Sequence, residues 1–423
     1  ANADSVAIIN VNVIPMTSET VIPAQTVVVR DGSIAAIGDV ESVRAPEDAI
    51  VVDGTDRFLM PGFVEMHAHV TSTEPEEVQT LLDLFLANGV TTIRGMLGRS
   101  SHLELREDLA AGRIRGPRLI TSGPSLNGNS VSGPDEGARM VREQHAAGYD
   151  FVKIHPGLSA GEFNAIADQA NELGMPFAGH VPVSVGVQGA LDKGIATIDH
   201  LDGYMAAMLP ANSDPSGGYG GFFGVMLADE AEVSRLDALV AATVDAGVAN
   251  VPTESLFEQL VNDEPAAELS RRSEMRFVDE ATVSGWIAAK NRTTMERGFD
   301  PEVAALAIDI RRQLIRKLHE AGAVLLLGSD APQVFQVPGF SLHHELELMV
   351  AAGLTPYEAL ATGTTAPAEF FGLGSGTVEI GAPADLVLLD ANPLTDISNS
   401  RRIHGVVAAG RWSHAGQLLA DLE

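Results

Sequence analysis

Short β-rich runs alternate with longer helical patterns through the middle of this chain, and this alternation restricts its fold more than any other feature. Eight such runs lie at 58–70, 91–96, 118–123, 151–155, 176–181, 197–201, 250–253 and 324–330. Helical patterns fill the gaps, for example at 76–88, 159–173 and 301–321, each followed closely by a glycine that would end a helix. Such repeats are typical of a parallel sheet covered by helices. We therefore predict an α/β fold, a closed (β/α)8 barrel of TIM type, with functional residues at the C-terminal ends of its strands.

The two ends of the chain have a different sequence pattern from the middle. β-like runs separated by turn residues occur at 6–13, 26–30, 33–37, 376–380, 384–390 and 405–411. The pair Asp31-Gly32 between two of these runs is typical of a tight hairpin. We expect one small β-sandwich domain built from both termini, residues 1–58 plus 376–423, beside a barrel domain at residues 59–375.

Composition excludes several classes of function. The 57 acidic and 27 basic residues give a formal net charge of -30, which repels phosphate backbones and anionic lipid headgroups. No cysteine is present, so any metal would be bound through nitrogen and oxygen atoms. No apolar stretch reaches the roughly 18 residues of a membrane span. We expect a small-molecule substrate, no nucleic acid and no membrane insertion, and the sequence leaves homo-oligomer formation open.

The cellular location is only weakly indicated. Excess acid with scarce lysine resembles the surfaces of salt-adapted or exported proteins, and the first residues, Ala1-Asn2-Ala3, fit an end left by signal-peptide removal. We expect export to the periplasm or the extracellular space, with the cytoplasm as the alternative.

The first β-rich run ends in two histidines, His67 and His69. On a strand, residues i and i+2 share a face, so both imidazoles would point together toward one end of the barrel. That geometry suits a single metal ion. A His-x-His pair also occurs as a surface or packing feature, so the pair alone only suggests a metal.

The same placement recurs at the ends of four other apolar runs. The residues concerned are Lys153, His180, His200 and Asp330. An ionisable group at the buried end of a barrel strand is costly unless it is paired or bound to metal. This repetition predicts one shared metal centre.

Lys153 is the unusual member, because an ammonium group would repel a metal ion. A lysine desolvated inside a barrel loses its proton readily. Its neutral amine can then add carbon dioxide to give a carbamate whose two oxygens could bridge two ions. The alternative is an unmodified lysine paired with Asp330.

These residues, in this order, resemble the amidohydrolase superfamily, and the likeness covers essentially the whole chain. The shared motifs are Pro61-Gly-x-x-x-x-His67-x-His69, the lysine ending the fourth run, single histidines ending the fifth and sixth, and Gly328-Ser-Asp330. The segments 353–360, 362–367 and 376–387 extend the likeness. Within the superfamily the chain looks most like the branch of imidazolonepropionase-like proteins and Xaa-Pro dipeptidases.

The resemblance implies a binuclear, metal-dependent hydrolase. The ligands that it carries over are His67 and His69 for the buried ion, His180 and His200 for the outer ion, and the carbamate of Lys153 between them. Asp330 would bind the buried ion and act as general base, while a bridging hydroxide attacks the substrate. Zinc suits these ligands best, with manganese or cobalt as alternatives.

Four further residues are candidates for substrate contacts: Tyr204, His155, Arg94 and His344. Tyr204 would hydrogen-bond a substrate oxygen or only pack in a loop, and His155, two residues beyond Lys153, would face the same barrel end. Arg94 would neutralise a substrate carboxylate or simply pair with an acidic neighbour. His344, like His343, opens a helix shortly after Asp330.

A glycine-rich segment at 213–224 interrupts the alternation of strands and helices. Long loops at a barrel mouth often act as lids. We expect either a lid or a plain surface excursion here.

The resemblance leaves the substrate open. Arg94-Gly95 stands where many relatives have Arg-Asp, and 124–130 lacks the histidine that dipeptidase members often supply, so prolidase specificity is in doubt. Our first expectation is cleavage of an amide or peptide-like bond in a dipeptide or N-acyl amino acid. A lactonase or phosphotriesterase using the same centre is the runner-up. A mononuclear deaminase-like enzyme and a non-catalytic relic of the fold are further alternatives.

Overall fold

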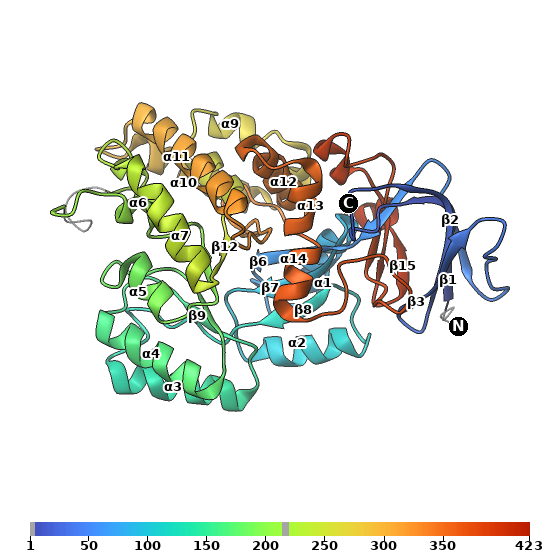
Figure 1. Cartoon of the computed structure of the whole chain (residues 1–423), viewed down its shortest axis with the longest axis horizontal. Helices are drawn as coiled ribbons and strands as arrows, with labels where there is room; N and C mark the ends of the chain where they lie inside the picture. Colours follow the sequence, from blue (N-terminus) through green and yellow to red (C-terminus); the bar gives the residue numbers. More distant parts are fainter. Residues whose placement is uncertain (1–4, 214–219) are drawn as a thin grey trace.

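The computed structural model describes residues 5–213 and 220–423. A helix-rich part that contains parallel sheets lies beside a sheet that holds strands from both ends of the chain (Figure 1). No helix in the described ranges is both long and apolar enough to cross a lipid bilayer.

The terminal sheet has eight strands, in the order β15-β14-β13-β5-β1-β2-β3 with β4 paired to β1. Their bounds are β1 (Ser5–Val13), β2 (Ile22–Arg30), β3 (Ser33–Asp39), β4 (Ile50–Asp53), β5 (Phe58–Pro61), β13 (Leu386–Leu389), β14 (Ile403–Ala408) and β15 (Arg411–His414). Asp31 and Gly32 both have positive φ between β2 and β3, which confirms the predicted hairpin. The run expected at 376–380 is not a strand.

The middle of the chain contributes two parallel sheets. One contains β6 (Phe63–Ala68), β7 (Val90–Gly95) and β8 (Arg118–Thr121), and the other contains β9 (Val152–Ile154), β10 (Phe177–Gly179), β11 (Thr197–Asp199) and β12 (Ala249–Val251). Isolated parallel bridges continue the pairing, from Ser122 to Phe151, from Asn250 to Leu325 and from Ala68 to Ala331. The seven strands are those that the alternation predicted, within a few residues at each end.

The expected eighth run, 324–330, is not a regular strand, yet hydrogen bonds hold it beside β6. The Met66 amide donates to the Leu327 carbonyl, and the Asp330 amide donates to the His67 carbonyl, both at 2.8 Å. Asp330 is thereby fixed next to the end of β6.

The first expected run, 58–70, divides into two strands of different sheets. β5 pairs with β1 and β13 in the terminal sheet, whereas β6 pairs with β7. Gly62 joins them, and a Cβ atom there would lie 2.4 Å from the Thr91 side chain, so only glycine fits. The change from one sheet to the other therefore falls at Gly62, within the run that the sequence presents as continuous.

Helices pack around the parallel strands (Figure 1). Their bounds are α1 (Pro75–Ala87), α2 (Ser101–Ala110), α3 (Pro134–Ala147), α4 (Ala160–Leu173), α5 (Gly186–Asp192), α6 (Tyr204–Ala207), α7 (Leu236–Ala246), α8 (Glu254–Val261), α9 (Ala266–Leu269), α10 (Glu280–Met295), α11 (Pro301–Glu320), α12 (Phe340–Ala352), α13 (Pro356–Thr362), α14 (Thr365–Phe371) and α15 (Ala415–Ala420), with 3-10 turns η1 (Phe222–Leu227), η2 (Val233–Arg235), η3 (Ser273–Phe277) and η4 (Ile397–Arg401). Local sequence explains their ends: Ser159 and Glu162 form a capping box at the start of α4, and left-handed Gly174 ends it. The largest apolar core lies where these helices contact the parallel strands, and it includes Phe85, Phe163 and Phe177.

Candidate metal centre

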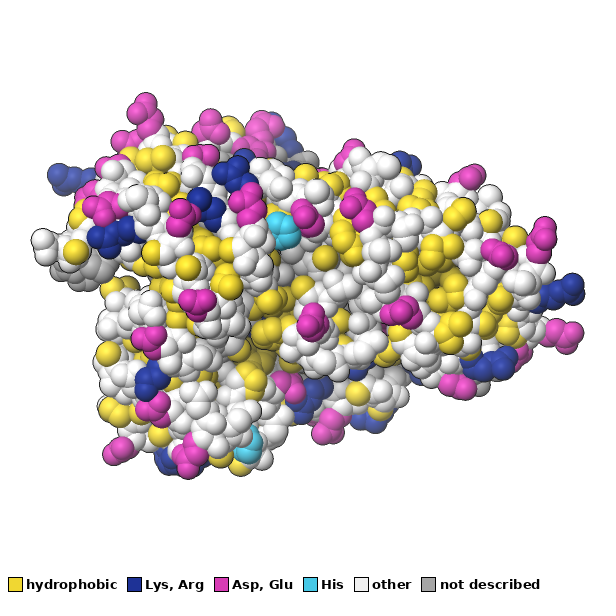
Figure 2. Space-filling model, viewed as in Figure 1, with side chains coloured by type: hydrophobic (Ala, Val, Ile, Leu, Met, Phe, Trp, Pro, Cys, Tyr) yellow, Lys and Arg dark blue, Asp and Glu magenta, His cyan; other side chains and the backbone are white. Residues whose placement is uncertain are grey.

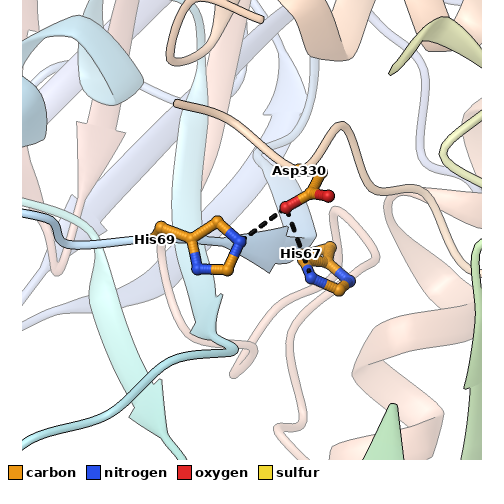
Figure 3. Close-up of side chains that lie close together, drawn as sticks. All are labelled: His67, His69 and Asp330. Carbon is orange, nitrogen blue, oxygen red and sulfur yellow. Dashed lines mark hydrogen bonds and ion pairs between the residues drawn. The ribbon is translucent and has the colours of Figure 1, made fainter. Parts of the chain in front are cut away.

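Three side chains at the ends of β6 and of the 324–330 segment point toward one another (Figure 3). His69 Nε2 lies 2.5 Å from Asp330 Oδ1, and His67 Nε2 lies 3.4 Å from the same oxygen. One ligand atom from each of the three residues lies within 4.8 Å of the others. The predicted His-x-His pair therefore meets the predicted aspartate at one point.

The other predicted ligands adjoin this group. Lys153 Nζ lies 3.4 Å from His67 Nε2, and His200 Nε2 lies 3.8 Å from Asp330 Oδ2. The rings of His180 and His200 are 4.8 Å apart between centroids. All six side chains predicted as ligands thus form one continuous cluster.

Hydrogen bonds behind His67 fix its tautomer. Its Nδ1 donates to Asp199 Oδ2 at 2.6 Å, and Arg94 Nη2 donates to the same oxygen at 2.9 Å. Asp199 is fully buried, and its Oδ2 accepts hydrogen bonds from both the imidazole and the guanidinium. His67 Nε2 consequently presents a lone pair to the cluster.

Burial keeps the central imidazoles neutral. Desolvation lowers the pKa of His67 and of His200 well below the ordinary histidine value, and nearby cationic groups lower both further. Neutral imidazole is the form that binds metal ions.

The contact between His67 and Asp330 tests whether the residues suit a metal ion. The lone pair of His67 Nε2 faces a carboxylate oxygen 3.4 Å away, and His69 Nδ1 is buried without a hydrogen-bond partner. Two acceptors in contact repel each other unless a cation lies between them. Imidazole nitrogens with a carboxylate are a donor set that zinc accepts, so the residues present fit a divalent ion.

His180 and His200 are held by different contacts. His180 Nδ1 lies 3.1 Å from Asp202 Oδ2, and His200 Nδ1 lies 2.7 Å from Thr253 Oγ1. The ring of Phe223 stacks on His200 with centroids 4.8 Å apart and planes 16° apart. An aromatic cover thus lies over this part of the cluster.

Lys153 has the burial that its predicted chemistry needs. Its side chain is fully buried, and desolvation lowers the pKa of its amine to about 8 against the pull of Asp199 and Asp330. A measurable fraction of this amine is therefore neutral, and hence nucleophilic, near neutral pH.

A cavity of about 530 Å³ opens onto the cluster. Its lining includes His67, His69, His180, His200 and Asp330 together with Arg99, His155, Phe222, Phe223, Leu256 and Leu260. This volume lies within the range of sites for small organic ligands.

Three of the four substrate-contact candidates do not line this cavity, whereas His155 does, with its ring stacked on His180. Tyr204 is buried, and its hydroxyl bonds Thr243 Oγ1 at 2.7 Å, so the packing alternative describes it. Arg94 pairs with Asp199 behind His67 rather than with a substrate. His344 pairs with Glu347 at 3.6 Å on α12.

Sequence reasoning missed several residues around the cluster. Asp199 stands directly before His200 and could have been noticed as an acid in a buried strand, and Thr253 closes a predicted run. Phe223 lies in the short turn η1 and Arg99 in a loop, and neither segment carries a periodic pattern. Of the glycine-rich segment expected as either a lid or a plain surface excursion, residues 214–219 lie outside the described ranges, and Phe222 and Phe223 line the cavity.

Comparisons with known proteins agree with this geometry. A family model described as "Amidohydrolase family" matches residues 58–413. The enamidase of Eubacterium barkeri is 22% identical over 409 residues, which cover 95% of this chain and 90% of that protein. The solved structure of a bottromycin amidohydrolase superposes with a TM-score of 0.73 at 24% identity, covering 98% of this chain and 88% of that one. A Xaa-Pro dipeptidase with methionine bound in its active site gives 0.70 at 19% identity, over 97% and 100% of the two chains.

Proposed function

The chain belongs to the amidohydrolase family, and we propose that it is a binuclear, metal-dependent enzyme that cleaves an amide or peptide-like bond in a dipeptide or N-acyl amino acid. The observation that carries this proposal is the contact between His67 Nε2 and Asp330 Oδ1, with buried Lys153 beside it. The lone pair of His67, the carboxylate of Asp330 and the readily deprotonated amine of Lys153 lie in contact, and cations bound among them would stabilise this arrangement.

We infer that the parallel strands form one closed (β/α)8 barrel. The bridges Ser122–Phe151, Asn250–Leu325 and Ala68–Ala331 support this, because each joins strand segments that are successive around such a barrel. We also infer that the terminal sheet forms a small sandwich, since a separate apolar cluster that includes Val6, Leu59 and Leu386 lies within it.

The proposed ligands divide between two ions. His67, His69 and Asp330 would hold the inner ion, His180 and His200 the outer one, and Lys153 as carbamate would contact both. Divalent ions held there would supply a nucleophilic water near neutral pH and polarise the substrate carbonyl. Zinc is the proposed metal, with manganese or cobalt as alternatives.

Asp330 is the residue proposed for proton transfer. Its side chain reaches the cavity while both of its oxygens face imidazoles. It would take a proton from the attacking water and deliver it to the leaving nitrogen, and this proton makes the amine a good leaving group. Asp199 and Arg94 would keep His67 in the tautomer that leaves Nε2 free.

Substrate turnover and metal content test the proposal together. Protein reconstituted with zinc and bicarbonate is expected to bind two ions per chain and to release amine from N-acyl amino acids and dipeptides. Lys153→Ala is expected to lose the outer ion and the activity. If the wild type binds one ion per chain and Lys153→Ala retains it, a mononuclear enzyme would be favoured. Cleavage of lactones or phosphotriesters with no turnover of any amide would overturn the proposed bond.

A further inference from the structure

We propose that Arg99 binds a carboxylate of the substrate, and that Phe222, Leu256 and Leu260 hold an apolar, ring-sized group on the other side of the bond that is cut. This inference rests on the proposed amide hydrolysis and specifies which amides the cavity accepts.

Arg99 is a basic side chain at the cavity that no acid neutralises. It follows β7, is half-buried, and donates from Nη2 to the Thr71 carbonyl at 3.2 Å. It makes no ion pair with any residue in the described ranges, whereas Arg94 nearby is paired with Asp199. A guanidinium group carries five N–H donors in a planar fork, so most of its capacity remains free for a ligand.

The acidity of the protein makes this exception informative. The chain has 57 acidic residues against 27 basic ones, and acidic side chains are spread over the face shown in Figure 2. An arginine at the cavity could therefore easily have met a partner within the chain. A planar, bidentate ion pair with a substrate carboxylate would use the donors that are left.

The opposite wall of the cavity is apolar. Leu256 and Leu260 are buried on α8, and the ring of Phe222 lies 4.2 Å from that of Phe223 and 6.3 Å from that of Phe257. The rings of Phe222 and Phe223 and the two leucines form this wall. Burial of a flat apolar group against it is more favourable than burial of a small polar group.

The order of the strands places these walls apart. Arg99 follows β7 and Phe222 follows β11, and β8, β9 and β10 lie between those two strands in the parallel pairing. The histidine cluster lines the same cavity. A substrate that fills this cavity of about 530 Å³ would thus place one half at Arg99, the other at Phe222, and its central bond over the cluster.

N-Acyl amino acids with a bulky apolar acyl group match both walls. In the hydrolysis, water gives its oxygen and one hydrogen to the acyl carbon, the C–N bond breaks, and the nitrogen takes the other hydrogen. The products are an apolar carboxylic acid and an amino acid, whose own carboxylate stays at Arg99 until it leaves.

Three probes and three arginine variants test the inference on the metal-loaded enzyme. N-Benzoyl-phenylalanine carries both features, N-phenethylbenzamide lacks the carboxylate, and N-acetyl-phenylalanine lacks the aromatic acyl group. Arg99→Gln is expected to lower kcat/KM for N-benzoyl-phenylalanine about 10- to 100-fold, the range for a lost hydrogen bond to a charged group, mainly through KM. The same variant should change N-phenethylbenzamide by less than about twofold, and Arg99→Lys should recover part of the loss. Arg44→Gln removes one exposed charge from the loop between β3 and β4 and is the matched control.

Leu260→Ala tests the apolar wall separately. It is expected to lower kcat/KM for N-benzoyl-phenylalanine about tenfold and to leave N-acetyl-phenylalanine nearly unchanged, as for truncation of a hydrophobic pocket. Equal losses on both compounds would overturn the assignment of this wall.

Binding separates a failure of this inference from a failure of the proposed function. Calorimetry with N-benzoyl-phenylalanine should show binding to the wild type that Arg99→Gln weakens and Arg44→Gln does not. Binding without turnover would refute the proposed bond while keeping the carboxylate site. Turnover of all three probes with equal sensitivity to Arg99→Gln, or no binding of any probe, would overturn the inference itself.

Discussion

The inner part of the cluster, His67, His69 and Asp330, and the outer part, His180 and His200, are organised in different ways. His67 is 1% exposed and is backed by Asp199, which Arg94 neutralises in turn. His180 is 7% exposed, its partner Asp202 is more open to solvent, and Phe223 stacks beside it. Within the inner part, His67 is thus oriented by buried charge-assisted hydrogen bonds, whereas within the outer part His180 is held by a weaker contact at the cavity surface.

This difference teaches which part the protein itself pre-organises. A ligand whose tautomer and direction are fixed by a buried partner needs little reorganisation when a metal binds. His180, whose partner Asp202 is partly solvated, is better placed to adjust to a substrate. We therefore expect substitutions to have larger effects at the inner part than at the outer part.

The largest effect is expected for Asp330→Asn. The amide keeps the shape of the side chain but cannot accept a proton and carries no charge. We expect kcat to fall about 10³-fold, within the range for a general acid–base group, with the fold retained. Steady-state kinetics with parallel metal analysis measures this. Asp168→Asn, which alters an exposed pair with Lys193, is the control, and near-normal turnover by Asp330→Asn would remove this residue from proton transfer.

The comparison is sharpest between Asp199→Asn and Asp202→Asn, which make the same chemical change behind an inner and an outer histidine. Asp199→Asn is expected to weaken inner-ion affinity about 10- to 100-fold and to destabilise the fold, because it leaves buried Arg94 without its counter-charge. Asp202→Asn should have a smaller effect on both, since its carboxylate is partly solvated. Chelator competition measures the metal affinity of the two variants, and thermal unfolding measures their stability. Equal losses in both variants would contradict the distinction between the inner and outer parts of the cluster.

The smallest effect concerns the pH at which Lys153 takes up carbon dioxide. Because burial lowers its pKa to about 8, the neutral amine appears as pH rises through 8, far below the pH that an ordinary lysine needs. Its neutral fraction, and with it the initial rate of carbamate formation at a fixed pressure of carbon dioxide, should rise about tenfold between pH 7 and pH 9. Carbon-13 NMR of metal-free protein under labelled carbon dioxide measures this.

Lys290 supplies the control for that experiment. Its pKa is also lowered to about 8, but its amine donates to the Gln259 carbonyl and to two oxygens of Asn262. The carbamate signal should disappear in Lys153→Ala and persist in Lys290→Met. A signal that survives in Lys153→Ala would show that the buried amine at the cluster is not the site.

The cluster could be predicted from sequence because the proposed ligands end short apolar runs. His67 and His69 share a strand face, and Lys153 and Asp330 each follow a run that is visible within a few residues. The role of Tyr204 could not be predicted in this way. Whether its hydroxyl points into the cavity or bonds Thr243 depends on where α7 packs. The division of 58–70 at Gly62 was also hidden, since both strands are apolar and the hydrophobic pattern does not change between them. Arg99 lies in a loop and Phe223 in the short turn η1, and neither segment has a hydrophobic period that would predict the direction of a side chain.

The position of β5 has a consequence for synthesis of the chain. β5 lies between β1 and β13, and the amide of Gly62, five residues before His67, donates to the Asp385 carbonyl. One of the two edges of this strand therefore stays unpaired on the ribosome until almost the entire chain has been translated. The segment leading to the first proposed metal ligands, His67 and His69, is secured by one of the last strands to be made, so a nascent chain completes the pairing of β5 only late in synthesis.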